Sequence, residues 1–206
     1  WGEYGAWRKL KNGRLICPNE IWVCDKFALK KAEKIFKKTK IIMKNNFYLE
    51  SMKKLIKKSI IKESNNKKVF NILYICEPID DNFKMDYYKN KKNIKFTEKK
   101  AISFFFKNIY KINKKIDSIC FRPHPSENIN KYQWVKKMYS KKFKISIFRD
   151  NNLINQIMDS SCIVGCSSFP LVFGVIAKKR VISNIPLKDA KCVLPYSEIE
   201  NLNQLI

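Results

Sequence analysis

Short apolar runs alternate with segments of helical periodicity along most of the chain. In the first part, strands are predicted over 20–25 and 40–43, and the apolar residues of 27–36 recur at helical spacing. A lysine-rich helix is predicted over 48–62, and the polar stretch that follows it has no period. We therefore place a boundary in that stretch, which divides the chain into residues 1–64 and residues 65–206.

The second part opens with a nearly continuous apolar run, which is typical of a parallel strand buried on both faces. After this run (69–76) and a polar loop, we expect helices over 97–113, 132–139 and 152–158, and strands over 118–121, 143–148 and 162–164. An apolar helix, a short strand around Val181 and the start of another helix over 198–206 come last. This regular alternation predicts a doubly wound α/β protein with parallel sheets and crossover helices.

Composition narrows the range of partners. The chain of 206 residues is 45% hydrophobic and 13% aromatic, enough for a folded core, and its formal net charge is +25. Nucleic-acid binding is not the interpretation we favour, because the charge comes mainly from lysines spread along the chain. Arginine, which makes bidentate phosphate and base contacts, is scarce. Such a basic surface still favours anionic substrates and peripheral contact with an anionic membrane face.

The cysteines and the membrane signals point to a cytoplasmic protein. The seven cysteines form no CxxC pair, and His124 is the chain's one histidine, so we expect no metal site and no cofactor. Scattered cysteines within apolar runs are typical of buried, reduced thiols. No secretory signal and no apolar span of membrane-crossing length is present in the sequence.

Two loops follow predicted strands and carry the residues with the most distinctive chemistry. One is the turn Gly165-Cys166-Ser167-Ser168, whose backbone N–H groups and hydroxyls suit an anion before a helix. Serines in this position are also common as simple helix caps. Ligands of doubly wound sheets bind at the carboxyl ends of strands, where both loops are predicted to lie.

The second loop is Arg122-Pro123-His124-Pro125-Ser126-Glu127. The two prolines restrict the backbone around His124, which would then point in a set direction and donate to a phosphate oxygen. Packing or helix capping is the alternative role for this histidine. Arg122 would clamp a phosphate or form a surface ion pair, and Glu127 would accept from a ribose hydroxyl or help to start the next helix.

Together these motifs resemble the nucleotide-binding half of bacterial GT-B-fold glycosyltransferases. The likeness is closest to sialyltransferase-like and polysialyltransferase-like groups, which carry an HP motif and a downstream Ser-Ser motif. It covers residues 69–186, and residues 18–48 resemble the end of the N-terminal domain of such enzymes. The resemblance implies two Rossmann-like domains, with the acceptor-side domain truncated in residues 1–64 and the nucleotide-sugar domain in residues 65–206.

The resemblance also implies an activity. It predicts an inverting, metal-independent transferase that moves a sugar from a CMP-sugar donor to a cell-surface glycan or glycolipid, as in capsule or lipopolysaccharide synthesis. His124 would contact the donor phosphate and assist the departure of CMP. Ser167, Ser168 and Gly165 would hold the phosphate, while Arg122, Pro125 and Glu127 would lie near the nucleotide.

Two alternatives and one departure from the family pattern remain. CDP-alcohol glycerophosphotransferases of the teichoic-acid type share a similar HP loop, and a non-catalytic Rossmann-like protein could bind an anionic polymer. The family's general base lies in an acidic triplet ending in glycine, which this sequence lacks; Glu3 and Asp25 are the nearby acids. We therefore expect the base to lie before Trp1 and residues 1–206 to be inactive alone.

Overall fold

The computed structural model describes residues 17–62, 69–79, 96–149, 152–188, 190 and 192–206. The chain forms two compact units, residues 1–51 and 52–206. The division falls within helix α2 (Phe47–Lys62). The boundary predicted near residue 64 lies outside the described residues and stays a prediction.

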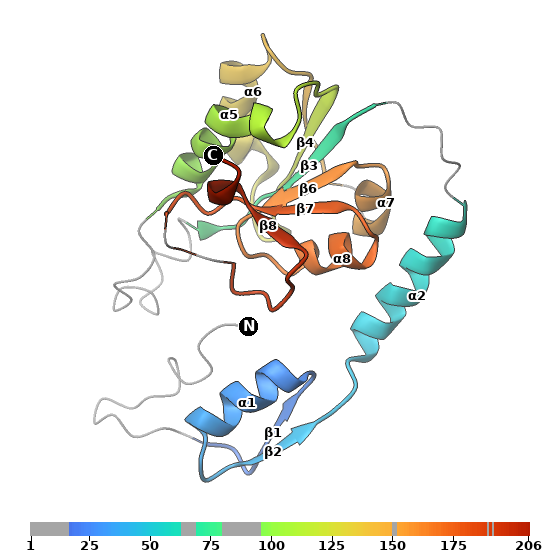
Figure 1. Ribbon diagram of the computed structural model, residues 1–206, viewed down its shortest axis with the longest axis vertical. Coiled ribbons are helices and arrows are strands. Elements are labelled where there is room, and N and C mark those ends of the chain that lie inside the picture. Colours follow the sequence, from blue (N-terminus) through green and yellow to red (C-terminus); the bar gives the residue numbers. More distant parts are fainter. Residues whose placement is uncertain (1–16, 63–68, 80–95, 150–151, 189, 191) are drawn as a thin grey trace. The chain divides into compact units, whose positions relative to one another are not determined.

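The first unit contains a small βαβ motif (Figure 1). Strands β1 (Glu20–Val23) and β2 (Lys40–Met43) pair in parallel, and helix α1 (Lys26–Ile35) connects them. Asp25 begins this helix as its N-cap, since its carboxylate accepts a hydrogen bond of 2.7 Å from the N–H of Ala28. Ala28 and Ala32 turn toward the strands and are buried, as the predicted helical spacing requires.

The second unit is built on one parallel sheet of six strands. In chain order the strands are β3 (Asn71–Ile75), β4 (Ser118–Arg122), β5 (Ile145–Ile147), β6 (Cys162–Gly165), β7 (Arg180–Ser183) and β8 (Ile199–Asn201). Their order across the sheet is β5-β4-β3-β6-β7-β8, and every neighbouring pair is parallel. This is the order of Rossmann-type sheets, in which the chain reverses its winding direction between the two central strands.

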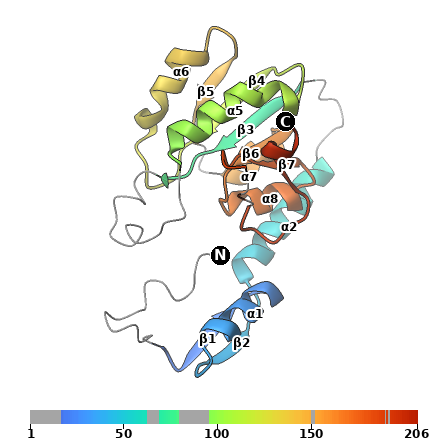
Figure 2. The same cartoon turned by 60° about the vertical axis from the view of Figure 1, so that its left-hand side comes forward.

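Helices cover both faces of this sheet (Figures 1 and 2), so the predicted doubly wound α/β fold is confirmed. One face carries α5 (Glu98–Ile112), the short 3-10 helix η2 (Ile129–Tyr132) and α6 (Gln133–Tyr139). The other carries α7 (Leu153–Met158) and α8 (Pro170–Ile176). Thr97 caps α5 and Asn113 ends it, as the sequence predicted.

Packing inside the second unit explains why the sequence of β3 is an almost unbroken apolar run. Ile72, Leu73 and Tyr74 of β3 are all buried, because helices pack against both sides of this central strand. On the α5 face, the ring of Tyr74 stacks on Phe121 with centroids 4.8 Å apart. On the opposite face, a Cβ at Gly174 would lie only 2.9 Å from Cγ2 of Val181, so glycine allows α8 to approach β7 closely.

The C-terminal residues correct one prediction. Residues 198–206 were expected to begin a helix, but the structure has strand β8 and a single 3-10 turn, η3 (Leu202–Gln204). The spacing of Ile199 and Leu202 resembles helical periodicity, yet pairing with β7 decides the conformation. Arg180 of β7 fixes this pairing through two hydrogen bonds to the carboxylate of Glu200.

Candidate functional site

Two sequence motifs lie on either side of the central strand β3, at the carboxyl edge of the sheet. The loop containing His124 follows β4, and the serine turn follows β6; β3 pairs with both strands. The position between β3 and β6 is also where the winding direction reverses. Doubly wound sheets bind their ligands in the crevice at this switch point. The predicted placement of the two loops at strand ends is therefore confirmed, and the topology brings them within one strand of each other.

The His124 side chain is half-buried and has a defined hydrogen-bonding pattern. Its Nδ1 accepts from the backbone N–H of Ser126 at 3.2 Å and lies 2.7 Å from the Ser126 hydroxyl. Because a backbone N–H can only donate, Nδ1 is the acceptor and the proton of the neutral ring lies on Nε2. No described residue forms a hydrogen bond with Nε2. This nitrogen is thus free to donate to a ligand oxygen.

The buried side chain of Glu127 holds the same loop through hydrogen bonds. Its side chain is only 1% exposed, and its oxygens accept from the His124 N–H at 3.1 Å, the Tyr132 hydroxyl at 3.0 Å and Lys131 at 2.7 Å. Lys131 also bonds the buried Glu98 at the start of α5 at 2.7 Å. The predicted contact of Glu127 with a nucleotide would require this carboxylate to leave its partners, whereas Pro125 of the same loop is exposed.

The two arginines near the loop have different surroundings. Arg122 is hydrogen-bonded to Gln156 of α7, so its guanidinium lies on the α7 side of the sheet. Arg149, which follows β5, donates instead to the carbonyl of His124 at 2.8 Å. The sequence analysis did not single out Arg149. Its position directly after a predicted strand was the available signal, because all carboxyl ends of parallel strands meet at one edge.

The serine turn differs from the expected open anion site. The backbone N–H groups of Cys166 and Ser167 donate to one oxygen of Glu77, at 2.8 and 2.7 Å. Helix α8 begins at Pro170 with Phe169 as its N-cap, so neither serine caps it. The hydroxyls of Ser167 and Ser168 are half-buried and have no hydrogen-bond partner among the described residues. Two hydroxyl groups therefore remain for a ligand, while two backbone donors already hold a carboxylate.

Gly165 has a steric role in this turn. A Cβ at this position would lie 3.3 Å from the carbonyl oxygen of Ile75 and 3.3 Å from a methyl carbon of Leu171. These contacts are tighter than ordinary packing, so a larger residue would push β6 away from β3 or from α8. Gly165 thus positions the turn at the sheet edge, and the structure shows no further function for it.

Glu77 is the central residue that the sequence analysis missed. It lies two residues after the end of β3, at the switch point, but was assigned to a polar loop because the apolar run ends there. Burial raises the pKa of Glu77 to about 7, and the N–H groups of the turn oppose this rise. A carboxyl group that changes charge near pH 7 at a ligand-binding edge is a candidate for proton transfer or proton-linked binding.

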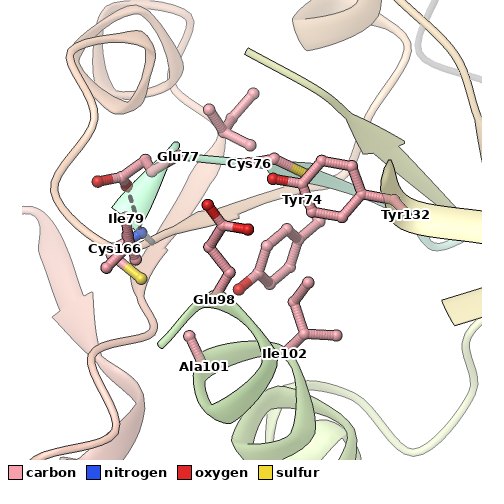
Figure 3. Close-up of a pocket in the computed structure, with 10 residues that line it drawn as sticks. Tyr74, Cys76, Glu77, Ile79, Glu98, Ala101, Ile102, Tyr132 and Cys166 are labelled. Atoms are coloured by element: carbon pink, nitrogen blue, oxygen red, sulfur yellow. Dashed lines mark hydrogen bonds between the residues drawn. The ribbon is translucent and has the colours of Figure 1, made fainter. Parts of the chain in front are cut away.

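A small cavity lies beside Glu77, as Figure 3 shows. Its volume is about 10 Å³, and its polar lining includes Glu77, Glu98, Tyr74 and Tyr132. One water molecule needs roughly 10–15 Å³, so the cavity has room for little more than a single water. The cavity is too small for a substrate, so a larger ligand would have to bind outside it.

The structure also bears on the remaining predictions from the sequence. Within the described residues, no cluster of three or more His, Cys, Asp or Glu side chains could hold a metal ion. None of the seven cysteines forms a disulfide; Cys76, Cys162 and Cys166 are buried, while Cys17 and Cys24 are exposed. Asp25 serves as a helix cap, and Glu3 lies outside the described residues. No described helix is both long enough and apolar enough to span a membrane.

Comparison with known proteins adds little to this picture. No protein-family model matches the sequence, and no curated protein matches it. One solved structure, Thermosulfurimonas dismutans KpsC, beta Kdo 2,7 transferase, is similar with 14% identity and a TM-score of 0.39. The match covers 85% of this chain and 54% of the other, so this chain spans about half the length of that protein. At this TM-score the likeness supports no inference about function. Any such inference must rest on the residues at the sheet edge.

Proposed function

We propose that this chain supplies the donor-binding side of an inverting, metal-independent glycosyltransferase that acts on a cell-surface glycan or glycolipid. The observation that carries the proposal is the position of two motif loops on either side of strand β3. RPHPSE begins at the last residue of β4 and GCSS at the last residue of β6, and the switch point of this Rossmann-type sheet lies between β3 and β6. Their sequences resemble the HP and Ser-Ser motifs that hold CMP in sialyltransferase-like enzymes.

In this proposal each loop has a separate task. The Nε2–H of His124 donates to an oxygen of the donor phosphate and stabilises the negative charge of departing CMP. The hydroxyls of Ser167 and Ser168 bind the phosphate from the β6 side. Arg149 holds the carbonyl of His124 and contributes positive charge near the leaving group. The residue that activates the acceptor is not assigned.

Isothermal titration calorimetry with CMP, CDP, UDP and GDP tests the proposal. We expect CMP to bind, and we expect His124→Ala and the double variant Ser167→Ala/Ser168→Ala each to weaken binding at least about tenfold. Ser197→Ala, at an exposed serine away from the edge, is the matched control and should bind like the wild type. Circular dichroism checks that each variant is folded.

The possible outcomes separate the rival functions. Absence of all nucleotide binding at millimolar concentration would contradict an enzyme of this class. Tighter binding of CDP than CMP would favour a CDP-alcohol phosphotransferase over a CMP-sugar enzyme. CMP binding that is unchanged in both variants would show that the nucleotide binds elsewhere.

A further inference from the structure

Glu77 occupies a position that an external anion would otherwise take. One of its oxygens accepts both the Cys166 and Ser167 N–H groups, at 2.8 and 2.7 Å. The same turn is held from β7, where the fully buried hydroxyl of Ser183 donates to the carbonyl of Cys166 at 2.7 Å. The turn that presents Ser167 and Ser168 therefore has an ionisable contact with Glu77 in addition to neutral contacts such as that of Ser183.

The surroundings of Glu77 contain several acidic and neutral titratable groups. They are Tyr74 from β3, Cys76 directly after it, Cys166 from the turn, Glu98 from α5, and Glu127 and Tyr132 from the β4–α6 segment. Glu98 and Glu127 share Lys131 as their hydrogen-bonded cation. Within the described part of the chain no lysine or arginine pairs with Glu77, and burial raises the pKa of its carboxyl group to about 7. It therefore changes charge within the physiological range.

We propose that Glu77 is a proton-linked positioning residue of the donor site. Its carboxyl group holds the turn that presents Ser167 and Ser168, and it takes up a proton when a phosphate group binds to their hydroxyls. This inference rests on the proposed function, because it requires the phosphate of a nucleotide at the serine turn.

Geometry explains the coupling. Since Oε1 of Glu77 lies 2.7 Å from the nitrogen of Ser167, a phosphate on the Ser167 hydroxyl would lie within about 4–7 Å of the carboxylate. A like charge at that distance favours the neutral form of a carboxyl group. The protonated carboxyl retains a carbonyl oxygen that accepts both N–H groups, so the turn keeps its shape. Phosphate binding and protonation of Glu77 thus favour each other.

Calorimetry on the full chain measures this coupling directly. Titration of CMP at pH 8 in two buffers with different ionisation enthalpies gives the number of protons taken up on binding. We expect Glu77→Gln to take up about half a proton fewer than the wild type. It should also bind CMP about 3–10-fold more tightly at pH 8 and equally well at pH 6. The nucleotide and all other ionisable groups are the same in both proteins, so the difference between them isolates Glu77.

Two further variants separate positioning from simple stability. Ser183→Ala removes the neutral contact to the same turn, and it should lower the melting temperature while keeping the proton uptake of the wild type. Glu77→Ala removes the acceptor itself, and it should weaken CMP binding at least about tenfold at both pH values. Glu77→Gln should not show this loss of CMP affinity, because its amide oxygen accepts hydrogen bonds from the same two N–H groups.

Equal proton uptake in the wild type and Glu77→Gln, with CMP bound by both, overturns this inference and leaves the proposed function intact. Weaker binding by folded Glu77→Gln at pH 8 also overturns it. Failure of the wild type to bind CMP between pH 6 and pH 8 overturns the inference and the proposed function together.

Discussion

At the scale of single residues, the hydrogen-bond partners of a side chain determine its chemical role more than its residue type does. Glu77 and Glu127 are both glutamates near the sheet edge, but Glu127 is hydrogen-bonded to Lys131 whereas Glu77 is held by two backbone N–H groups. A backbone N–H carries a partial charge only, so it offsets less of the cost of burying a carboxylate than an ammonium group does. Burial consequently raises the pKa of Glu77 to about 7.

This raised pKa makes a prediction for stability without any ligand. The folded state binds the Glu77 proton more tightly than the unfolded chain, so the free energy of unfolding falls as pH rises from about 4.5 to 7. Glu77→Gln lacks this loss. We expect the variant to be about 1–2 kcal/mol more stable than the wild type at pH 8, and no more stable at pH 4. Urea unfolding at the two pH values measures the difference.

Glu198→Gln provides the control for this experiment, because Glu198 is an exposed glutamate of the same unit. Its effect on stability should be small at both pH values. A stability difference for Glu77→Gln that is the same at pH 4 and pH 8 would contradict a proton-linked origin and indicate altered packing.

At the scale of elements, Arg180 joins three segments that are far apart in the sequence. Its Nε and NH2 groups donate to the two carboxylate oxygens of Glu200 in β8, at 2.8 and 2.7 Å. Its NH1 group donates to the carbonyl of Ile112 at the end of α5, at 2.6 Å. A bidentate pair fixes orientation as well as distance. The edge strand β8, only three residues long, therefore depends on this arginine for its register.

Removing the charge of this pair should weaken the edge of the sheet. The hydrogen bonds from Arg180 lower the pKa of Glu200, so the pair stabilises the fold above the ordinary pKa of glutamate and loses this effect in acid. Both side chains are about one-third exposed, so we expect Glu200→Gln to cost only about 0.5–1 kcal/mol at pH 7. Urea unfolding at pH 7 and pH 3 checks this. An equal cost at pH 3 would point to lost packing instead of a lost ion pair.

A helix, strand or site residue could be predicted from the sequence where its contacts lie close along the chain, and was missed where they lie far apart. The helices predicted over 97–113 and 152–158 have Thr97, Asn113 and Asn152 as their caps in the structure, and capping acts over only a few residues. Strand β8 was missed because its conformation depends on Arg180, twenty residues earlier. Glu77 and Arg149 were missed for a related reason. Their roles depend on contacts with the serine turn and the His124 loop, which only the strand order brings near.

At the scale of the whole second unit, the order of the strands creates the candidate site. Strand β3 lies between β4 and β6, although 39 residues separate the ends of β4 and the start of β6 in the sequence (Arg122 and Cys162). The switch in winding direction leaves the carboxyl ends of β3 and β6 without a crossover helix between them. The hydroxyls of Ser167 and Ser168, the imidazole of His124 and the carboxyl of Glu77 consequently share one edge.

The net charge of +25 offers a second way to bind anions, and ionic strength separates the two. A polymer such as heparin, held by many dispersed lysines, releases counterions on binding, so its affinity should fall at least about 100-fold between 50 and 200 mM NaCl. CMP, held by a few hydrogen bonds at the sheet edge, should weaken less than about tenfold over this range. Fluorescence anisotropy of labelled heparin and calorimetry with CMP measure the two slopes.

The double variant Ser167→Ala/Ser168→Ala connects this measurement to the site. Because two hydroxyl groups contribute nothing to the net charge, their removal should leave the heparin affinity and its salt dependence unchanged while weakening CMP binding. If CMP affinity instead fell with salt as steeply as heparin affinity and ignored the two serines, the basic surface would be the binding site. The chain would then be an anionic-polymer binder on a Rossmann-type sheet, and the edge between β3 and β6 would have only a structural role.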